Sequence, residues 1–177
     1  MATILLTLLA MLVGQAPSTR EYQNKPCSYS FQHPQDWEVV KGPDDRTKEC
    51  LAMLRPVDYE KRMAEFDVDV YTVTVQVSEH SFLQVADENG FDFNGEWLVL
   101  GRQGASTGAE ISKSNGRLTL TGTATIGCFH EKGGYAGLCE ETRVVAKYEG
   151  DDRIVAITGN NAGLVDTILT TFKFSPR

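Results

Sequence analysis

Four cysteines and one histidine are the residues of this 177-residue sequence whose types and spacing most directly indicate chemistry. Cys128 and Cys139 enclose ten residues that include His130, Glu131 and three glycines. A zinc ion could take both thiolates, the imidazole and the carboxylate, but the tight C-x₂₋₄-C and H-x₃₋₅-H pairs of zinc sites are missing. A C-x-x-C redox motif is missing too. We therefore favour a disulfide that staples a hairpin loop, with a metal site and a reactive thiol as the alternatives.

The even number of cysteines predicts two disulfides. Cys27 and Cys50 lie in one local stretch, and Cys128 and Cys139 lie in another. Four cysteines allow three connectivities, and sequence does not choose among them, so the two local pairs are only the favoured solution. Because disulfides persist in oxidising compartments, this pattern indicates a protein exported from the cytoplasm.

The N-terminus supports export. Residues 1–19 contain no charged side chain, and the apolar run Ile4–Val13 is shorter than the ~20 residues that a membrane-spanning helix needs. The small residues Gly14 and Ala16 suit a signal-peptide cleavage site. We expect a signal peptide over residues 1–19 and a single domain over 20–177. The mature protein is then periplasmic or extracellular, without stable membrane insertion.

The charge balance restricts the class of partner. The net charge is −7 and the pI is about 5.0, whereas nucleic-acid binding needs a cationic face. We expect an unknown protein or small-molecule partner, no nucleic acid, and no cofactor.

Two further stretches resemble catalytic or metal-binding motifs. "GASTG", from Gly104 to Gly108, matches G-x-S-x-G and places Ser106 as a possible nucleophile. The motif requires a strand before the serine and a helix after it, and the following stretch is too short for that helix. "DENGFDFNGE", from Asp87 to Glu96, is rich in oxygen ligands but fails the EF-hand spacing. We therefore predict neither a catalytic residue nor a metal ligand.

Elements that would position these residues are mostly strands. Residues 71–77 and 118–126 alternate apolar and polar side chains, which is typical of one-sided strands in an antiparallel sheet. Asn115-Gly116 predicts a type I′ hairpin turn before the second of them. Further strands are expected at residues 28–32, 37–40, 50–55, 97–101, 110–113, 143–148 and 153–158.

Three helices are expected between and after these strands. One begins near Pro56, one follows Ser78 or Ser81 as N-cap and ends at Gly90, and one follows Asn160 or Asn161. Strands with separated helices, and without regular βαβ alternation, indicate an α+β fold.

Both ends of the predicted mature chain resemble a known family. "YSFQHPQDWEVV", from Tyr29 to Val40, and "RIVAITGNNAGLVDTILTTFKF", residues 153–174, are similar to the ends of the Mog1/PsbP-like superfamily, in particular its exported bacterial-type members. The resemblance implies an α/β/α sandwich around a mostly antiparallel β-sheet. It also implies that Trp37 and Phe172 are core residues and that no catalytic residue carries over. Members of the superfamily act mainly as binding or assembly accessories.

The functional prediction follows from these observations. We expect a non-enzymatic binding or assembly accessory module of the cell envelope or the extracellular space, stabilised by two disulfides. Its candidate binding loop comprises Phe129, His130, Glu131 and Tyr135. The alternatives are a small serine hydrolase that uses Ser106 and a metal-binding domain.

Overall fold

The fold is known from a computed structural model. It describes residues 18–40, 50–66, 72–94, 97–100, 106–129 and 134–176. The predicted signal peptide falls almost entirely on residues 1–17, outside these ranges.

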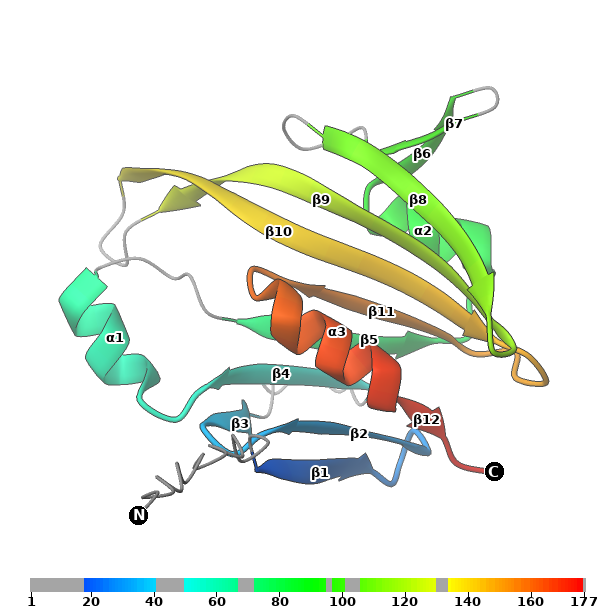
Figure 1. The fold of residues 1–177 in the computed structure, drawn as a ribbon, viewed down its shortest axis with the longest axis horizontal. Coiled ribbons are helices and arrows are strands. Elements are labelled where there is room, and N and C mark those ends of the chain that lie inside the picture. The colour runs from blue at the N-terminus through cyan, green and yellow to red at the C-terminus, as the bar shows by residue number, and fades with distance from the viewer. Residues whose placement is uncertain are drawn as a thin grey trace, which may run out of the picture.

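A seven-stranded antiparallel sheet forms the centre of the molecule, with the strand order β3-β4-β5-β11-β10-β9-β8 (Figure 1). Asn115 and Gly116 have φ angles of 52° and 69°, as a type I′ turn requires, and this turn joins β8 to β9. The strands are β3 (Trp37–Val40), β4 (Leu51–Pro56), β5 (Val73–Ser78), β8 (Ser106–Ser114), β9 (Arg117–Phe129), β10 (Tyr135–Tyr148) and β11 (Ile154–Gly159).

One face of this sheet is covered by helix α3 (Ala162–Thr171) and by a three-stranded sheet of β1 (Thr19–Asn24), β2 (Tyr29–Pro34) and β12 (Lys173–Phe174). The Asn161 side chain caps α3 by accepting a hydrogen bond from the Leu164 N–H at 2.9 Å. The apolar side of α3 packs with Trp37 and Phe172 in one buried cluster. Both core positions implied by the family resemblance are therefore confirmed.

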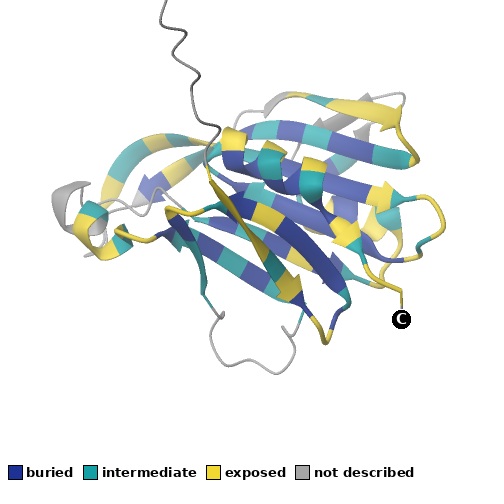
Figure 2. Cartoon of the chain, turned by 60° about the horizontal axis from the view of Figure 1, so that its bottom comes forward, coloured by how far each residue is buried: buried dark blue, intermediate teal, exposed yellow. Residues whose placement is uncertain are grey.

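The opposite face carries helix α2 (Phe82–Glu88) and the two-stranded hairpin of β6 (Phe91–Asn94) and β7 (Trp97–Leu100). Ser81 is the N-cap of α2. Val144 and Ala146 of β10 belong to the α3-side cluster, whereas Val145 between them belongs to the α2-side cluster. This alternation packs one sheet between two layers, and Figure 2 shows that buried residues concentrate in its central strands. The predicted sandwich is confirmed.

Three element predictions were wrong or incomplete. Pro56 ends β4 opposite Trp37, and the helix α1 (Tyr59–Phe66) begins three residues later. Strand β7 lies where a strand was predicted, at 97–101, but its partner β6 lies in a stretch where none was predicted. Phe91 of β6 is buried against α2, and this burial outweighs the turn-forming neighbours. Strands β9 and β10 also extend much further toward the loop between them than alternation alone indicated.

Candidate functional site

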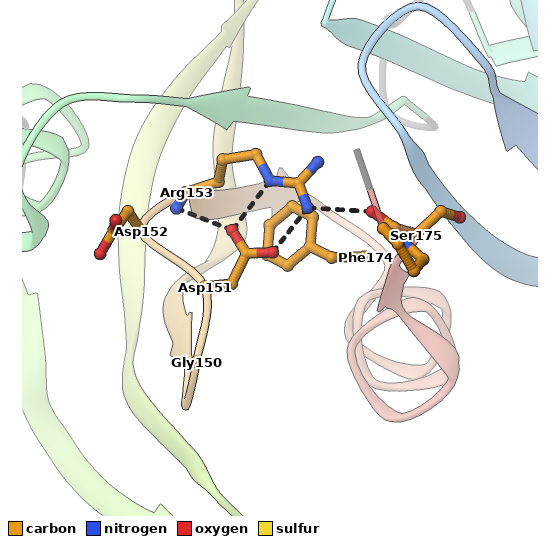
Figure 3. Close-up of a pocket in the computed structure, with 7 residues that line it drawn as sticks. Gly150, Asp151, Asp152, Arg153, Phe174 and Ser175 are labelled. Atoms are coloured by element: carbon orange, nitrogen blue, oxygen red, sulfur yellow. Dashed lines mark hydrogen bonds and ion pairs between the residues drawn. The ribbon is translucent and has the colours of Figure 1, made fainter.

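A hollow of about 450 Å³ lies where the turn between β10 and β11 meets the C-terminal residues (Figure 3). Arg153 forms one wall, with its guanidinium carbon 4.1 Å from the centre of the Phe174 ring. The complete lining is Gly150, Asp151, Asp152, Arg153, Phe174, Ser175 and Pro176.

Protein acceptors already use the Arg153 guanidinium, which is in a residue only 5% exposed. Its Nε and Nη2 donate to the two carboxylate oxygens of Asp151, and these hydrogen bonds hold the pKa of Arg153 above its usual value. Nη1 donates to the carbonyl oxygens of Cys27 and Ser28 at 3.0 and 3.1 Å, and Nη2 donates to the Ser175 carbonyl at 3.2 Å. An arginine has five N–H donors, and five hydrogen bonds use them. Arg153 thus ties three chain segments together and has no donor left for a ligand.

A second hollow, of about 430 Å³, lies on the other side of the same turn. Leu118 stands between Lys113 and Lys147 in the register of β8, β9 and β10. The acidic residues Glu149 and Asp152 line the same hollow. Both positive and negative side chains line it, so its charge favours neither anions nor cations.

The cysteines form the two local pairs that the sequence favours. Cys27 bonds to Cys50 and Cys128 bonds to Cys139, with Cα–Cα distances of 5.4 and 5.8 Å. In the β9–β10 register Cys128 lies opposite Gly137, so the second bond runs diagonally across the two strands. All four thiols are consumed, so thiolate ligands are unavailable. Within the described ranges, no group of three or more His, Cys, Asp or Glu side chains could hold a metal ion.

Glycines shape the loop beside the second disulfide. Gly134 and Gly137 have φ angles of 102° and 119°, a backbone region that side chains other than glycine rarely enter. The β9–β10 register shifts between Tyr135 and Gly137. The predicted stapled hairpin is therefore present, with Gly134 and Gly137 at positive φ, and Gly133 lies outside the described residues.

The candidate binding residues are only partly described. Phe129 ends β9, and its backbone lies opposite that of Tyr135, the first residue of β10. Tyr135 is 61% exposed. His130 and Glu131 lie outside the described residues. Their role in binding stays a prediction.

One exposed residue of this hairpin was missed by the sequence reading. Leu138 is 70% exposed, more than the other exposed large apolar side chains of the described residues, which are 57–61% exposed. Its even spacing from Val144 and Ala146 in the sequence puts it on the α3 side of β10. We call residues 121–129 and 135–144, the part of β9 and β10 farthest from the Asn115-Gly116 turn, the hairpin arm.

Ser106 does not occupy a nucleophile elbow. It is the first residue of β8, opposite Ala124 of β9, and β8 continues to Ser114. The G-x-S-x-G motif therefore lacks the helix that must follow its serine.

The fold is an α+β sandwich of the Mog1/PsbP-like type, and its two disulfides suggest an oxidising compartment. No protein-family model and no curated protein sequence matches the chain. Among the described residues, no helix is long and apolar enough to cross a bilayer.

Solved structures supply the likeness. PsbP (CyanoP) from Synechocystis sp. PCC 6803 is similar with a TM-score of 0.50 and 15% identity, over 92% of this chain and 95% of that one. The Ran-binding protein Mog1p from Saccharomyces cerevisiae aligns with a TM-score of 0.45 and 9% identity, over 90% and 96%. A protein from Bacteroides thetaiotaomicron VPI-5482 aligns with a TM-score of 0.49 and 10% identity, over 89% of this chain and 48% of that one. At these identities the likeness establishes the fold alone.

Proposed function

We propose that this chain is an exported, non-enzymatic binding or assembly accessory module, and that it contacts its partner through the end of the hairpin arm. The observation that carries the proposal is the exposure of two large apolar side chains, Tyr135 at 61% and Leu138 at 70%, on strand β10 beside the Cys128–Cys139 disulfide.

The physical argument concerns the cost of ordering a binding surface. A flexible loop loses conformational entropy when it binds, whereas a covalently closed hairpin has lost much of it already. Aromatic side chains are enriched at protein interfaces, where large apolar area is buried. Tyr135 and Leu138 together offer such apolar area on a segment that the Cys128–Cys139 disulfide fixes to the neighbouring strand β9. Phe129 at the end of β9, with His130 and Glu131 that follow it in the sequence, would complete the proposed surface.

Two features support the proposed location. Both disulfides fit an oxidising compartment, and residues 1–19 have the composition of a signal peptide. The periplasm or the extracellular space satisfies both. The partner is a protein or a small molecule, and the net charge of −7 disfavours nucleic acid.

Site-specific photocrosslinking tests the proposal. A photoreactive amino acid replaces Leu138 in the full chain, expressed in its native host, and a matched variant carries it at Asp166, an exposed position on α3. We expect a discrete adduct from position 138, weakened in the Cys128→Ser/Cys139→Ser variant, and none from position 166. The same adducts from both positions, or none from position 138, would contradict the proposal.

A further inference from the structure

One face of strands β8, β9 and β10 extends beyond the helix that covers its base. Val144 and Ala146 of β10 lie on the α3 side of the sheet. Alternate residues of a strand point to the same side of the sheet, so the other even-numbered residues of β10 also lie on the α3 side. The residues that the antiparallel register places opposite them on β9, and in turn on β8, lie on this side too. We call the uncovered part the threonine face: Glu110 of β8, Thr121, Thr123 and Thr125 of β9, and Leu138, Glu140 and Thr142 of β10.

Solvent reaches this face. Glu110, Leu138 and Glu140 are exposed, and the four threonines are half-buried. In Figure 1, α3 lies against β10 and β11 near the base, and the long strands β8, β9 and β10 continue past it. The face is thus polar in its middle and apolar at its end, where Leu138 lies near Tyr135.

Its charge has one sign. Glu110 and Glu140 make no hydrogen bond or ion pair with any residue that the structure describes. Arg117 lies on the same side of β9, but it donates to the carbonyl of Leu169 at the end of α3. The exposed lysines of these strands, Lys113 and Lys147, are both paired with Leu118 in the strand register. They therefore lie on the α2 side of the sheet, away from the threonine face.

The size of the face indicates what could cover it. Glu110 lies opposite Thr121 and Glu140 lies opposite Thr125, so the two residues are four positions apart along the strands, about 13 Å. They are also two strand spacings apart across β9, about 10 Å, so the direct separation of their backbones is about 16 Å. This separation suits two cationic side chains on one extended partner better than it suits a single small cation. The hydroxyls of Thr121 and Thr125 on the strand between them can donate to or accept from the backbone of such a partner.

We propose that the threonine face binds a basic polypeptide segment of a partner protein. Glu110 and Glu140 pair with two of its Lys or Arg side chains, and Leu138 and Tyr135 contact an apolar side chain of the same segment. This inference rests on the proposed function and adds the chemistry of the partner. Charge complementarity of this kind sets partner choice and the rate of association.

Peptide binding to the purified, isotope-labelled full chain tests the inference. The probes are a lysine-rich decapeptide with one central leucine, the same peptide with glutamate in place of lysine, and the same peptide with serine in place of leucine. We expect the first to shift the backbone amide signals of Thr121, Thr123, Thr125 and Leu138 at low salt. The glutamate peptide should shift none of them, and the serine peptide should bind more weakly.

Two double variants separate a local from a global charge effect. Glu110→Gln/Glu140→Gln should raise the Kd of the lysine-rich peptide about fivefold, the scale of two exposed ion pairs. Glu149→Gln/Asp166→Asn removes the same net charge from exposed positions elsewhere and should leave the Kd unchanged. Equal weakening by both variants, no weakening by the first, or amide shifts confined to other strands would overturn the inference.

The crosslinking experiment distinguishes the two levels of the proposal. If position 138 still forms its adduct at full yield in the Glu110→Gln/Glu140→Gln variant, the basic-partner inference fails and the proposed function stands. If position 138 forms no adduct in the native host while Glu110 and Glu140 are unchanged, the proposed function fails, even where the lysine-rich peptide binds.

Discussion

Arg153 and Asp151, two residues apart in the turn just before β11, form an ion pair through two points of contact. Arg153 Nε donates to Asp151 Oδ1 at 2.8 Å, and Nη2 donates to Oδ2 at 2.5 Å. Three further hydrogen bonds from the same guanidinium reach the turn before β2 and the residues after β12. This side chain joins the two ends of the domain to the central sheet, although it lies in the wall of a hollow that resembles a ligand site.

Arg153→Lys should therefore lower the free energy of unfolding by about 2 kcal/mol, because the ammonium keeps the charge but loses the planar fork of donors. Urea unfolding measures this loss as a shift of the midpoint. Arg20→Lys, at an exposed position of β1, is the matched control and should change stability by less than about 0.5 kcal/mol. Equal midpoints for the two variants would show that the fork is not needed.

Local signals in the sequence predicted the features that depend on neighbouring residues. Alternation identified Val73, Val75 and Val77 as one buried row, and all three are buried. Ser81 and Asn161 were each one of two candidate caps, and the structure shows that their side-chain oxygens accept from backbone N–H groups three residues later. These contacts join residues that are close in the sequence, so they can be predicted from the sequence alone.

Features that depend on distant segments were not predictable in the same way. The role of Arg153 requires the carbonyls of Cys27, Ser28 and Ser175, which only the folded chain brings together. The exposure of Leu138 depends on where α3 ends its cover of β10, and no pattern near Leu138 reports that. The candidate loop was located from the cysteine spacing, but the open face beside it needed the strand register.

Gly159 and Gly163 should respond in opposite directions to alanine. A Cβ at Gly159 would lie 2.6 Å from Cγ2 of Val73 and 2.8 Å from the Thr72 carbonyl oxygen, so Gly159→Ala should destabilise by about 1–3 kcal/mol. A Cβ at Gly163 of α3 would meet nothing closer than 3.6 Å, so Gly163→Ala should stabilise by about 0.5–1 kcal/mol. Thermal unfolding of both variants checks the signs. A stable Gly159→Ala variant would contradict the close approach of β11 to β5.

The two disulfides should differ in their effect on stability. Cys27 is buried in the main cluster, and removal of its bond to Cys50 by Cys27→Ala/Cys50→Ala should cost about 3 kcal/mol of global stability. Cys128→Ser/Cys139→Ser should chiefly raise the hydrogen-exchange rates of amides in the hairpin arm, because this end of the sheet can open without the core. Measuring exchange at Val155 of the core in both variants separates the cases. Equal acceleration there would show that the arm unfolds only with the whole domain.

Alkaline pH should destabilise the protein through buried tyrosines. Burial raises the pKa of Tyr29 well above its usual value of 10.0, and burial also raises the pKa of Tyr148. The unfolded chain therefore loses these protons first as pH rises, so stability is full below pH 10 and falls above it. Tyr29→Phe should flatten this fall, and Tyr29→Phe/Tyr148→Phe should flatten it further. Urea unfolding between pH 8 and pH 11, a range chosen to bracket about pH 10, measures the slopes. If the variants show the same dependence of the unfolding free energy on pH as the unsubstituted protein, groups other than these two tyrosines cause the alkaline destabilisation.

Leu138 and Leu120 allow stability to be separated from binding. Leu120 of β9 is 0% exposed in the α2-side cluster, so Leu120→Ala should cost about 2–5 kcal/mol. Leu138 is 70% exposed, so Leu138→Ala should change the free energy of unfolding by less than about 0.5 kcal/mol. The same Leu138→Ala variant should weaken binding of the leucine-containing peptide, since it removes apolar area from the proposed surface. Urea unfolding and peptide titration of one protein sample give both quantities. A large loss of stability in Leu138→Ala would mean that this side chain serves the fold, and the case for a binding surface at the hairpin arm would lose its main support.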